Sequence, residues 1–412
     1  MITKYTCQNG VRVVLEKMST VRSVAIGIWV GIGSRDERTD NNGISHFLEH
    51  MFFKGTTTRN AKELAEAFDS IGGQVNAFTS KEYTCYYAKV LDNHAKYALE
   101  TLSDMFFNST FAEDELNKEK NVVREEIKMY EDTPDDIVHD LLSKAAYDTH
   151  PLGFPILGTE QSLATFTSNL LNSYVEEKYI PENIVVSVAG NVDEPFIYEI
   201  ERLFGNFERK GKAARETKPV FQTNRAVKQK ETEQAHLCIG FEGLPIGHPD
   251  IYKLIVMNNI FGGSMSSRLF QEVREERGLA YSVFSYHSSF KDSGLVTIYG
   301  GTGSNQADEL FETIQKTLST IKSTGVSEKE LNNSKEQLKG NLMLGLESTN
   351  SRMSRNGKNE LLLKKHRSLD EIIDEIDQVT VSCVNEMAEK IFTDQYTLAL
   401  ISPEKQLTLA AN

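Results

Sequence analysis

The chain has 412 residues, of which 39% are hydrophobic and 25% charged, a composition typical of a soluble globular protein. This length exceeds one ordinary hydrophobic core, so we expect two or more domains. The formal net charge of −14 argues against nucleic acid as a partner and is compatible with cationic peptides, although many cytosolic proteins are equally acidic.

The cysteines and the N-terminus indicate the compartment. The four cysteines lie far apart and form no Cys-x-x-Cys pair, which favours free thiols in a reducing environment over a disulfide framework. The first residues contain no apolar signal core, and no segment approaches the length of a membrane span. We therefore expect a cytoplasmic protein with no membrane partner.

Two strands are predicted first, at 11–16 and 23–31, and the first candidate functional residues follow them. A short helix is predicted between Gly43 and Gly55, and it carries His46, Glu49 and His50. At about 100° per residue the two histidines lie one turn apart, so both can bind one metal ion while Glu49 polarises a water. Two core histidines beside a charge are the simpler alternative, but a carboxylate on an apolar helix is costly to bury without a partner. The spacing is that of the inverted zincin motif His-x-x-Glu-His, so we favour a metal site.

A helix rich in glutamate is predicted at residues 113–131. On a helical wheel Glu126 lies about 20° from Glu119, inside the apolar stripe that includes Val123, whereas Glu125 lies about 120° away and outside it. Buried carboxylates need a cation. We therefore predict Glu126, rather than Glu125, as the third metal ligand, and Glu119 as a residue that orients a ligand or shares a proton. Without the histidine motif, a structural salt bridge would be the preferred interpretation of either residue.

The remaining elements of the first half alternate between helix and strand. His139 and His150 show no ligand pattern and are taken as non-metal residues. A polar, basic and unpatterned segment at 210–225 is the best candidate for an interdomain linker. The apolar patterns predict strands at 74–80, 83–91 and 184–190 and helices at 61–71, 92–107, 136–146 and 193–207.

Beyond the linker the order of elements repeats. Residues 235–241 resemble the strand at 24–29, and residues 326–332 parallel 111–117. In this register Glu126 corresponds to Asn341, and the histidine motif corresponds loosely to residues 255–259, so metal ligands occur only in the first copy. The sequence predicts an α+β protein with a metal-binding domain at 1–209, a linker at 210–225 and a homologous domain without metal ligands at 226–412.

The histidine motif, followed by a glutamate at the position of Glu126, resembles the pitrilysin-type (inverzincin) zinc metallopeptidases, in particular the small branch that includes mitochondrial processing peptidase. The resemblance covers nearly the whole chain and places the family's second glutamate on Glu119. It implies two homologous α/β-sandwich domains, each a sheet backed by helices, that together form half of a clamshell. It also implies a homodimer, or a heterodimer with a paralogue, in which the metal residues of one subunit face Arg274 and Tyr281 of the other.

The resemblance also implies roles for further residues. Arg274 and Tyr281 would position the substrate and its scissile carbonyl, and Asp136 and Asp140 would hold a basic substrate side chain. Glu49 would act as the proton acceptor. An edge strand would pair with the substrate backbone through Asn76, Ala77, Phe78 and Thr79.

The implied activity is hydrolysis of unfolded or short peptides, with basic, presequence-like peptides as one option. One zinc ion per chain is expected, although the same ligands also bind cobalt or manganese. The alternative is a non-catalytic core-type structural subunit, because some relatives keep the fold but have lost ligands. His46, Glu49, His50 and Glu126 are all present, which weighs against this alternative. A metal-dependent hydrolase of another bond is the third interpretation.

Overall fold

The computed structural model describes residues 2–209, 211 and 217–403. Part of the expected linker, residue 210 and residues 212–216, therefore lies outside the described residues, and the linker stays a prediction. The chain forms two compact units, and neither is a continuous segment. The first unit contains Met1–Lys128, Phe154–Glu216 and Leu344–His366, and the second contains Met129–Gly153, Thr217–Met343 and Arg367–Asn412.

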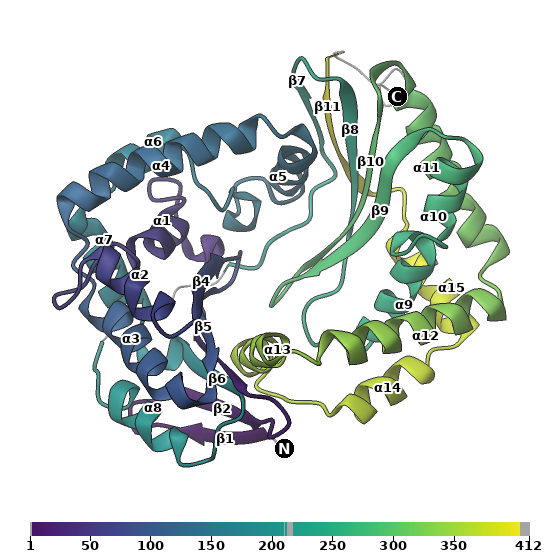
Figure 1. Ribbon diagram of the computed structural model, residues 1–412. Helices are drawn as coiled ribbons and strands as arrows, with labels where there is room; N and C mark the ends of the chain where they lie inside the picture. Colours follow the sequence, from purple (N-terminus) through teal and green to yellow (C-terminus); the bar gives the residue numbers. More distant parts are fainter. Residues whose placement is uncertain (1, 210, 212–216, 404–412) are drawn as a thin grey trace. The chain divides into compact units, whose positions relative to one another are not determined.

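The first unit is built on a six-stranded sheet with the order β1-β2-β6-β3-β5-β4 (Figure 1). β2 and β6 are parallel, and all other neighbours are antiparallel. The strands are β1 (Ile2–Thr6), β2 (Arg12–Lys17), β3 (Ser23–Val30), β4 (Gln74–Thr79), β5 (Thr84–Leu91) and β6 (Ile184–Gly190). The helices are α1 (Ile44–Met51), α2 (Ala61–Asp69), α3 (Ala95–Asn108), α4 (Glu113–Glu131), α6 (Glu160–Thr165), α7 (Ser168–Lys178), α8 (Phe196–Phe204) and α13 (Thr349–Leu362).

Both faces of this sheet are covered, which explains the continuous apolar sequences of its central strands. In β3, Ile26 and Ile28 belong to a large core together with Phe47 of α1, whereas Trp29 faces the opposite side. On that opposite side Trp29 packs with Met353 of α13, a helix from the far end of the chain. The sheet therefore supports α1 on one face while α13 covers the other.

The second unit is built on a five-stranded sheet with the order β7-β11-β8-β10-β9 (Figure 1). A core that contains Leu237 and Ile239 of β8 lies on one face, and α5 packs on the other face, where Leu142 lies in one cluster with Cys238. The strands are β7 (Arg225–Gln229), β8 (Gln234–Glu242), β9 (Ala280–Ser289), β10 (Gly294–Gly303) and β11 (Tyr396–Ser402). The helices are α5 (Pro134–Tyr147), α9 (Ile251–Gly262), α10 (Arg268–Phe270), α11 (Ala307–Thr324), α12 (Glu328–Gly345), α14 (Leu369–Asp377) and α15 (Val381–Ile391).

The two sheets share one topology, which confirms the predicted repeat of an α+β unit with a sheet backed by helices. The parallel pair β7 and β11 corresponds to β2 and β6, and β8, β10 and β9 follow as β3, β5 and β4 do. One feature differs from the continuous ranges 1–209 and 226–412. Each unit includes a helix from the other half of the sequence, α5 in the second unit and α13 in the first.

Among the residues that the structure describes, no helix combines the length and the apolar composition needed to cross a membrane.

Candidate metal centre

The helix that carries the histidine motif is fixed at its N-terminus by a buried carboxylate. Glu37, 2% exposed, accepts hydrogen bonds from the backbone N–H of Gly43 (2.7 Å) and of Ser45 (2.9 Å) and from the side-chain amide of Asn42 (2.9 Å). The first N–H groups of a helix have no partner within the helix, so Glu37 satisfies them and complements the helix dipole. Burial raises the pKa of the Glu37 carboxyl to about 7, although the hydrogen bonds that it accepts oppose this rise.

Gly43 is required at this helix start. Its φ of +92° lies in the left-handed region, and a Cβ atom there would lie 2.7 Å from the Cα of Gly158. The loop around Gly158 therefore packs directly against the beginning of α1, which leaves the position of the helix little freedom.

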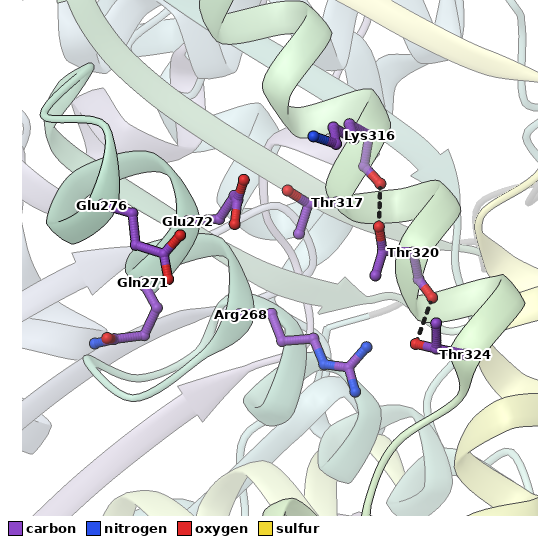
Figure 2. Close-up of a pocket in the computed structure, with 8 residues that line it drawn as sticks. All are labelled: Arg268, Gln271, Glu272, Glu276, Lys316, Thr317, Thr320 and Thr324. Atoms are coloured by element: carbon purple, nitrogen blue, oxygen red, sulfur yellow. Dashed lines mark hydrogen bonds between the residues drawn. The ribbon is translucent and has the colours of Figure 1, made fainter.

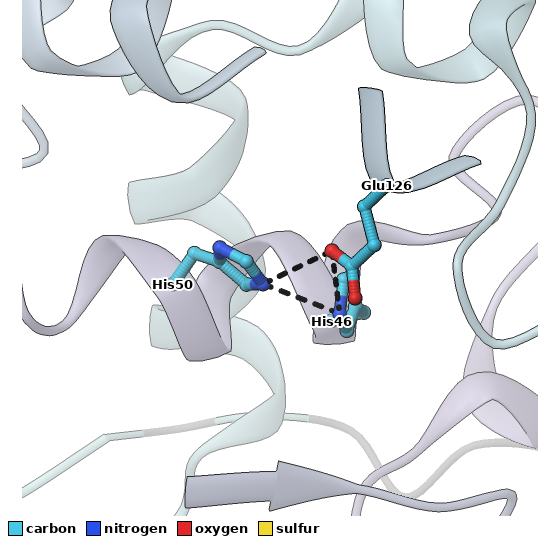
Figure 3. Close-up of side chains that lie close together, drawn as sticks. All are labelled: His46, His50 and Glu126. Carbon is cyan, nitrogen blue, oxygen red and sulfur yellow. Dashed lines mark hydrogen bonds and ion pairs between the residues drawn. The ribbon is translucent and has the colours of Figure 1, made fainter. Parts of the chain in front are cut away.

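Three side chains converge beside α1, as Figure 3 shows. The Nε2 atoms of His46 and His50 are 3.3 Å apart, and Oε2 of Glu126 lies 3.6 Å and 3.5 Å from them. The Glu126 Oε2 atom is buried and has no hydrogen-bond partner among the described residues. Burial, together with the charge of His50, lowers the pKa of His46 to about 3, so His46 is a neutral imidazole with a free lone pair at neutral pH.

This arrangement fits a metal ion. Nitrogen and oxygen ligands bind zinc at about 2.0–2.2 Å, so tetrahedral ligand atoms stand roughly 3.3–3.6 Å apart. The three measured separations lie in this range. Among the described residues, His46, His50 and Glu126 form the one group of three or more metal-binding side chains that is close enough for this purpose.

Glu126 comes from α4, and its surroundings differ from those predicted. The wheel predicts a buried side chain, but 33% of the Glu126 side chain is exposed, because this residue lies at the border of the stripe that α4 buries. Glu126 nevertheless differs clearly from Glu125 in exposure and in its contacts. Glu125 is 73% exposed and pairs with Lys128 at 2.8 Å on the outside of the helix.

Glu119 connects two basic side chains beside the centre. Its Oε1 lies 2.7 Å from Nδ1 of His50, and its Oε2 lies 2.6 Å from Nζ of Lys54. Burial disfavours the charged carboxylate, but hydrogen bonds with His50 and Lys54 outweigh burial and lower its pKa. An ionised Glu119 accepts a hydrogen bond from Nδ1–H of His50, which leaves the Nε2 lone pair directed to the centre. For His50 itself, burial disfavours the protonated form, but the interactions with Glu119 and Glu126 outweigh burial and raise the pKa.

Glu49 lies on the same helix and contacts the edge of the sheet. Its Oε2 accepts a hydrogen bond from the Thr79 hydroxyl at 2.6 Å. Burial raises the pKa of Glu49, and the hydrogen bond with Thr79 opposes this change. β4, which carries Asn76, Ala77, Phe78 and Thr79, is the last strand of its sheet and pairs only with β5 among the described strands. The expected open edge therefore lies directly beside the expected proton acceptor.

Arg274 and Tyr281 lie together in the second unit. Arg274 belongs to a short stretch of π-helix at Gln271–Glu276, a rare conformation that is frequent at functional sites. Its guanidinium carbon lies 4.8 Å from the ring centres of both Phe270 and Tyr281. Tyr281 is the second residue of β9, the edge strand of the second sheet, and is 79% exposed.

Asp136 and Asp140 lie one turn apart on α5 in the second unit. Both are near Tyr130, and their negative charges add to burial in raising the pKa of the Tyr130 hydroxyl. Nδ1 of His139 lies 2.9 Å from the hydroxyl of Tyr286, and Nε2 of His150 lies 2.9 Å from the carbonyl of Thr217. Neither histidine belongs to the metal-binding group.

The second unit carries neutral side chains at the corresponding place. In the register of the repeat, Asn259 takes the position of His50 and Ser334 that of Glu119. The Ser334 hydroxyl donates a hydrogen bond to Oδ1 of Asn259 at 2.8 Å. One polar contact replaces the other, but Asn259 and Ser334 supply neither the imidazole of His50 nor the carboxylate of Glu119.

Two residues of the centre have no counterpart in the sequence prediction, namely Glu37 and Lys54. A signal for Lys54 exists, because it follows His50 by one helical turn and can reach the same carboxylate. The chain gives no local signal for Glu37, whose contacts depend on how the loop before α1 folds back.

A separate hollow of about 400 Å³ lies in the second unit, beside α11 and the π-helical stretch (Figure 2). Its three threonine hydroxyls donate to carbonyl groups of their own helix, so they offer no free proton to a ligand. None of the predicted site residues lines it. The lining residues are Arg268, Gln271, Glu272, Glu276, Lys316, Thr317, Thr320 and Thr324.

Comparisons with known proteins agree with this geometry. Residues 12–160 match the family described as insulinase (peptidase family M16), and residues 165–338 match the peptidase M16 inactive domain. The chain is 67% identical to the protein named "Uncharacterized zinc protease YmxG" of Bacillus subtilis, over 98% of each chain. It is 38% identical to another uncharacterized zinc protease, from Mycobacterium leprae, over 98% of this chain and 92% of the relative.

Two solved structures share the fold. A protease from Helicobacter pylori has a TM-score of 0.92 at 24% identity, covering 98% of this chain and 99% of the other. A peptidase M16 inactive domain from Pseudomonas fluorescens has a TM-score of 0.92 at 19% identity, covering 98% of both chains. With the resemblance deduced from the histidine motif, these matches establish that the chain belongs to the insulinase-type peptidases of family M16.

Proposed function

We propose that this chain is a zinc-dependent endopeptidase that hydrolyses unfolded or short peptides. The observation that carries the proposal is the convergence of His46, His50 and Glu126 at zinc-ligand separations, with Glu49 on the same helix. The names of the relatives, which call them zinc proteases, support the choice of metal and reaction.

In this proposal His46, His50 and Glu126 hold one zinc ion. When bound, zinc supplies Lewis-acid chemistry, which lowers the pKa of water and polarises a carbonyl group. Glu49 accepts a proton from the attacking water and passes it to the amide nitrogen that leaves. Glu119 keeps the Nδ1 proton of His50 in place and so fixes the tautomer and the ring orientation of that ligand.

The substrate is a peptide that extends the first sheet at β4. Main-chain hydrogen bonds to residues 76–79 would give affinity with loose sequence demands, because every peptide carries the same backbone groups. Asp136 and Asp140 are assigned to a basic substrate side chain, which would give the chain a preference for basic, presequence-like peptides. Exchanging both for asparagine should raise KM for lysine- or arginine-rich peptides and leave KM for neutral peptides unchanged.

The proposal includes a dimer with a shared active site. Tyr281 would donate a hydrogen bond to the carbonyl oxygen as negative charge develops there, and Arg274 would anchor the substrate backbone or carboxylate. The family resemblance assigns these two residues to the partner subunit. Subunit exchange between an inactive Glu49→Gln chain and an inactive Tyr281→Phe chain should restore activity, since one site in the mixed dimer is complete. No recovery after demonstrated exchange would refute the shared site.

The central test measures zinc and peptide cleavage together. Purified full-length chain should bind one zinc ion and cleave a mixed peptide library, and a chelator should abolish the cleavage. Glu126→Gln should lose zinc and activity, Glu49→Gln should keep zinc and lose activity, and Glu125→Gln is the matched control that should keep both. Stoichiometric zinc without any peptide cleavage would favour either the non-catalytic subunit or a hydrolase of another bond.

A further inference from the structure

Thr79 joins the edge strand to the proton acceptor. It is the last residue of β4, and its hydroxyl donates a hydrogen bond to Oε2 of Glu49 at 2.6 Å. Among the residues that the structure describes, Thr79 is the one residue that hydrogen-bonds the Glu49 side chain. A short bond to a charged acceptor is among the stronger hydrogen bonds in proteins.

The chemistry of threonine suits this contact. Its β-branched side chain has few accessible χ1 rotamers, and the backbone of Thr79 is held by pairing with Thr84 of β5. The hydroxyl is therefore a rigid donor, whereas the side chain of Glu49 is long and, without a partner, free to adopt several rotamers. With Oε2 held by Thr79, the other carboxylate oxygen is left to exchange the proton.

We propose that Thr79 is a positioning residue, which holds Glu49 in one orientation at the end of the strand to which the proposed peptide substrate adds. The proposal rests on the proposed peptidase function. The backbone of Thr79 also stabilises the charged form of Glu49, so the test concerns the hydroxyl alone.

The test compares Thr79→Val with Thr79→Ser. Valine keeps the shape and removes the hydroxyl, so kcat should fall about tenfold or more, while KM changes less than about twofold. Serine keeps the hydroxyl, so most of kcat should return. Zinc content should stay at one ion per chain in both variants, because among the described residues the Thr79 side chain bonds Glu49 and none of the three ligands.

Thr84→Val is the matched control for a purely structural effect. Thr84 faces Thr79 across the strand pair, is fully buried, and its hydroxyl donates to the carbonyl of Ile32 at 3.0 Å. This variant should lose thermal stability but retain kcat. Thr79→Ala is a second hydroxyl-free variant should Thr79→Val not fold, and it should show the same loss of kcat.

Several results would overturn the proposal. These are a kcat of the hydroxyl-free variants within about twofold of the parent, a rise in KM without a fall in kcat, or a loss of zinc in step with activity. A parent chain that binds zinc but cleaves no peptide would instead overturn the proposed function. The two failures are therefore distinguishable.

Discussion

Replacing Glu119 by glutamine removes one negative charge from the centre with almost no change in volume. The carboxylate accepts from Nδ1 of His50 at 2.7 Å and from Nζ of Lys54 at 2.6 Å, and it is only 3% exposed. An amide has one acceptor oxygen, so glutamine can keep only one of the two hydrogen bonds, and that bond no longer has a charged acceptor. Hydrogen bonds to charged groups contribute about 1.5–3 kcal/mol. His50 then becomes a less basic and less firmly oriented ligand. We expect zinc affinity to fall about 10–100-fold, which corresponds to about 1.4–2.7 kcal/mol.

Competition with a chromophoric chelator at pH 7 measures this affinity directly. The matched control is Glu125→Gln on the same helix, whose parent side chain is exposed and paired with Lys128. The control should bind zinc within about twofold of the parent chain. Unchanged affinity in Glu119→Gln, or an equal loss in both variants, would refute the idea that Glu119 acts through His50. Thermal melting of the metal-free proteins separates this effect from a general loss of stability.

Three further outcomes are expected. Gly357→Ala on α13 should destabilise the protein by about 1–3 kcal/mol in chemical unfolding, because its Cβ would lie 2.2 Å from Nε1 of Trp29. Gly340→Ala on α12 is the control, and it should stabilise by about 0.5–1 kcal/mol, since nothing lies within 4 Å of that Cβ. The hydrogen bond from Arg268 lowers the pKa of Glu330 to about 2, so this pair should contribute stability above about pH 4.5 and lose it as the pH falls through 2. Parent and Glu330→Gln stabilities should therefore differ by about 1–2 kcal/mol at pH 7 and converge near pH 2, and a constant difference would contradict this assignment. Removal of zinc by a chelator should lower the melting temperature of the parent more than that of Glu126→Gln, as calorimetry can check, and equal shifts would contradict the ligand assignment.

Local pattern predicted much of the first sheet and the main features of the centre. The buried strand at 184–190 coincides with β6, since a continuous apolar run with β-branched residues suits a strand covered on both faces. Helical spacing, which is a local property, places His46 and His50 side by side on α1, whereas Glu126 comes from α4 and its convergence with them is tertiary. Contacts such as Thr79 with Glu49 need tertiary structure, because the sequence does not state which side chain of an edge strand faces a helix.

Helix α13 shows that the sequence also does not reveal which unit a helix packs in. Its sequence is polar, yet Met353, Asn356, Gly357 and Glu360 are buried. Glu360 pairs with Lys4 at 2.8 Å, so the burial of this helix depends on the opposite end of the chain. No pattern within α13 indicates that partner, and a division of the sequence at the linker therefore assigns the helix to the other half.

The exchange of α5 and α13 makes the two halves of the gene mutually dependent. A fragment that stops at the linker would leave Trp29 and its neighbours bare to water, while the complementary fragment would lack the helix that shields Cys238. Each fragment should be insoluble when produced alone, and both should regain solubility when they are produced together. Deletion of the second half of the sequence would therefore destabilise the first, even though the second half carries none of the three ligands.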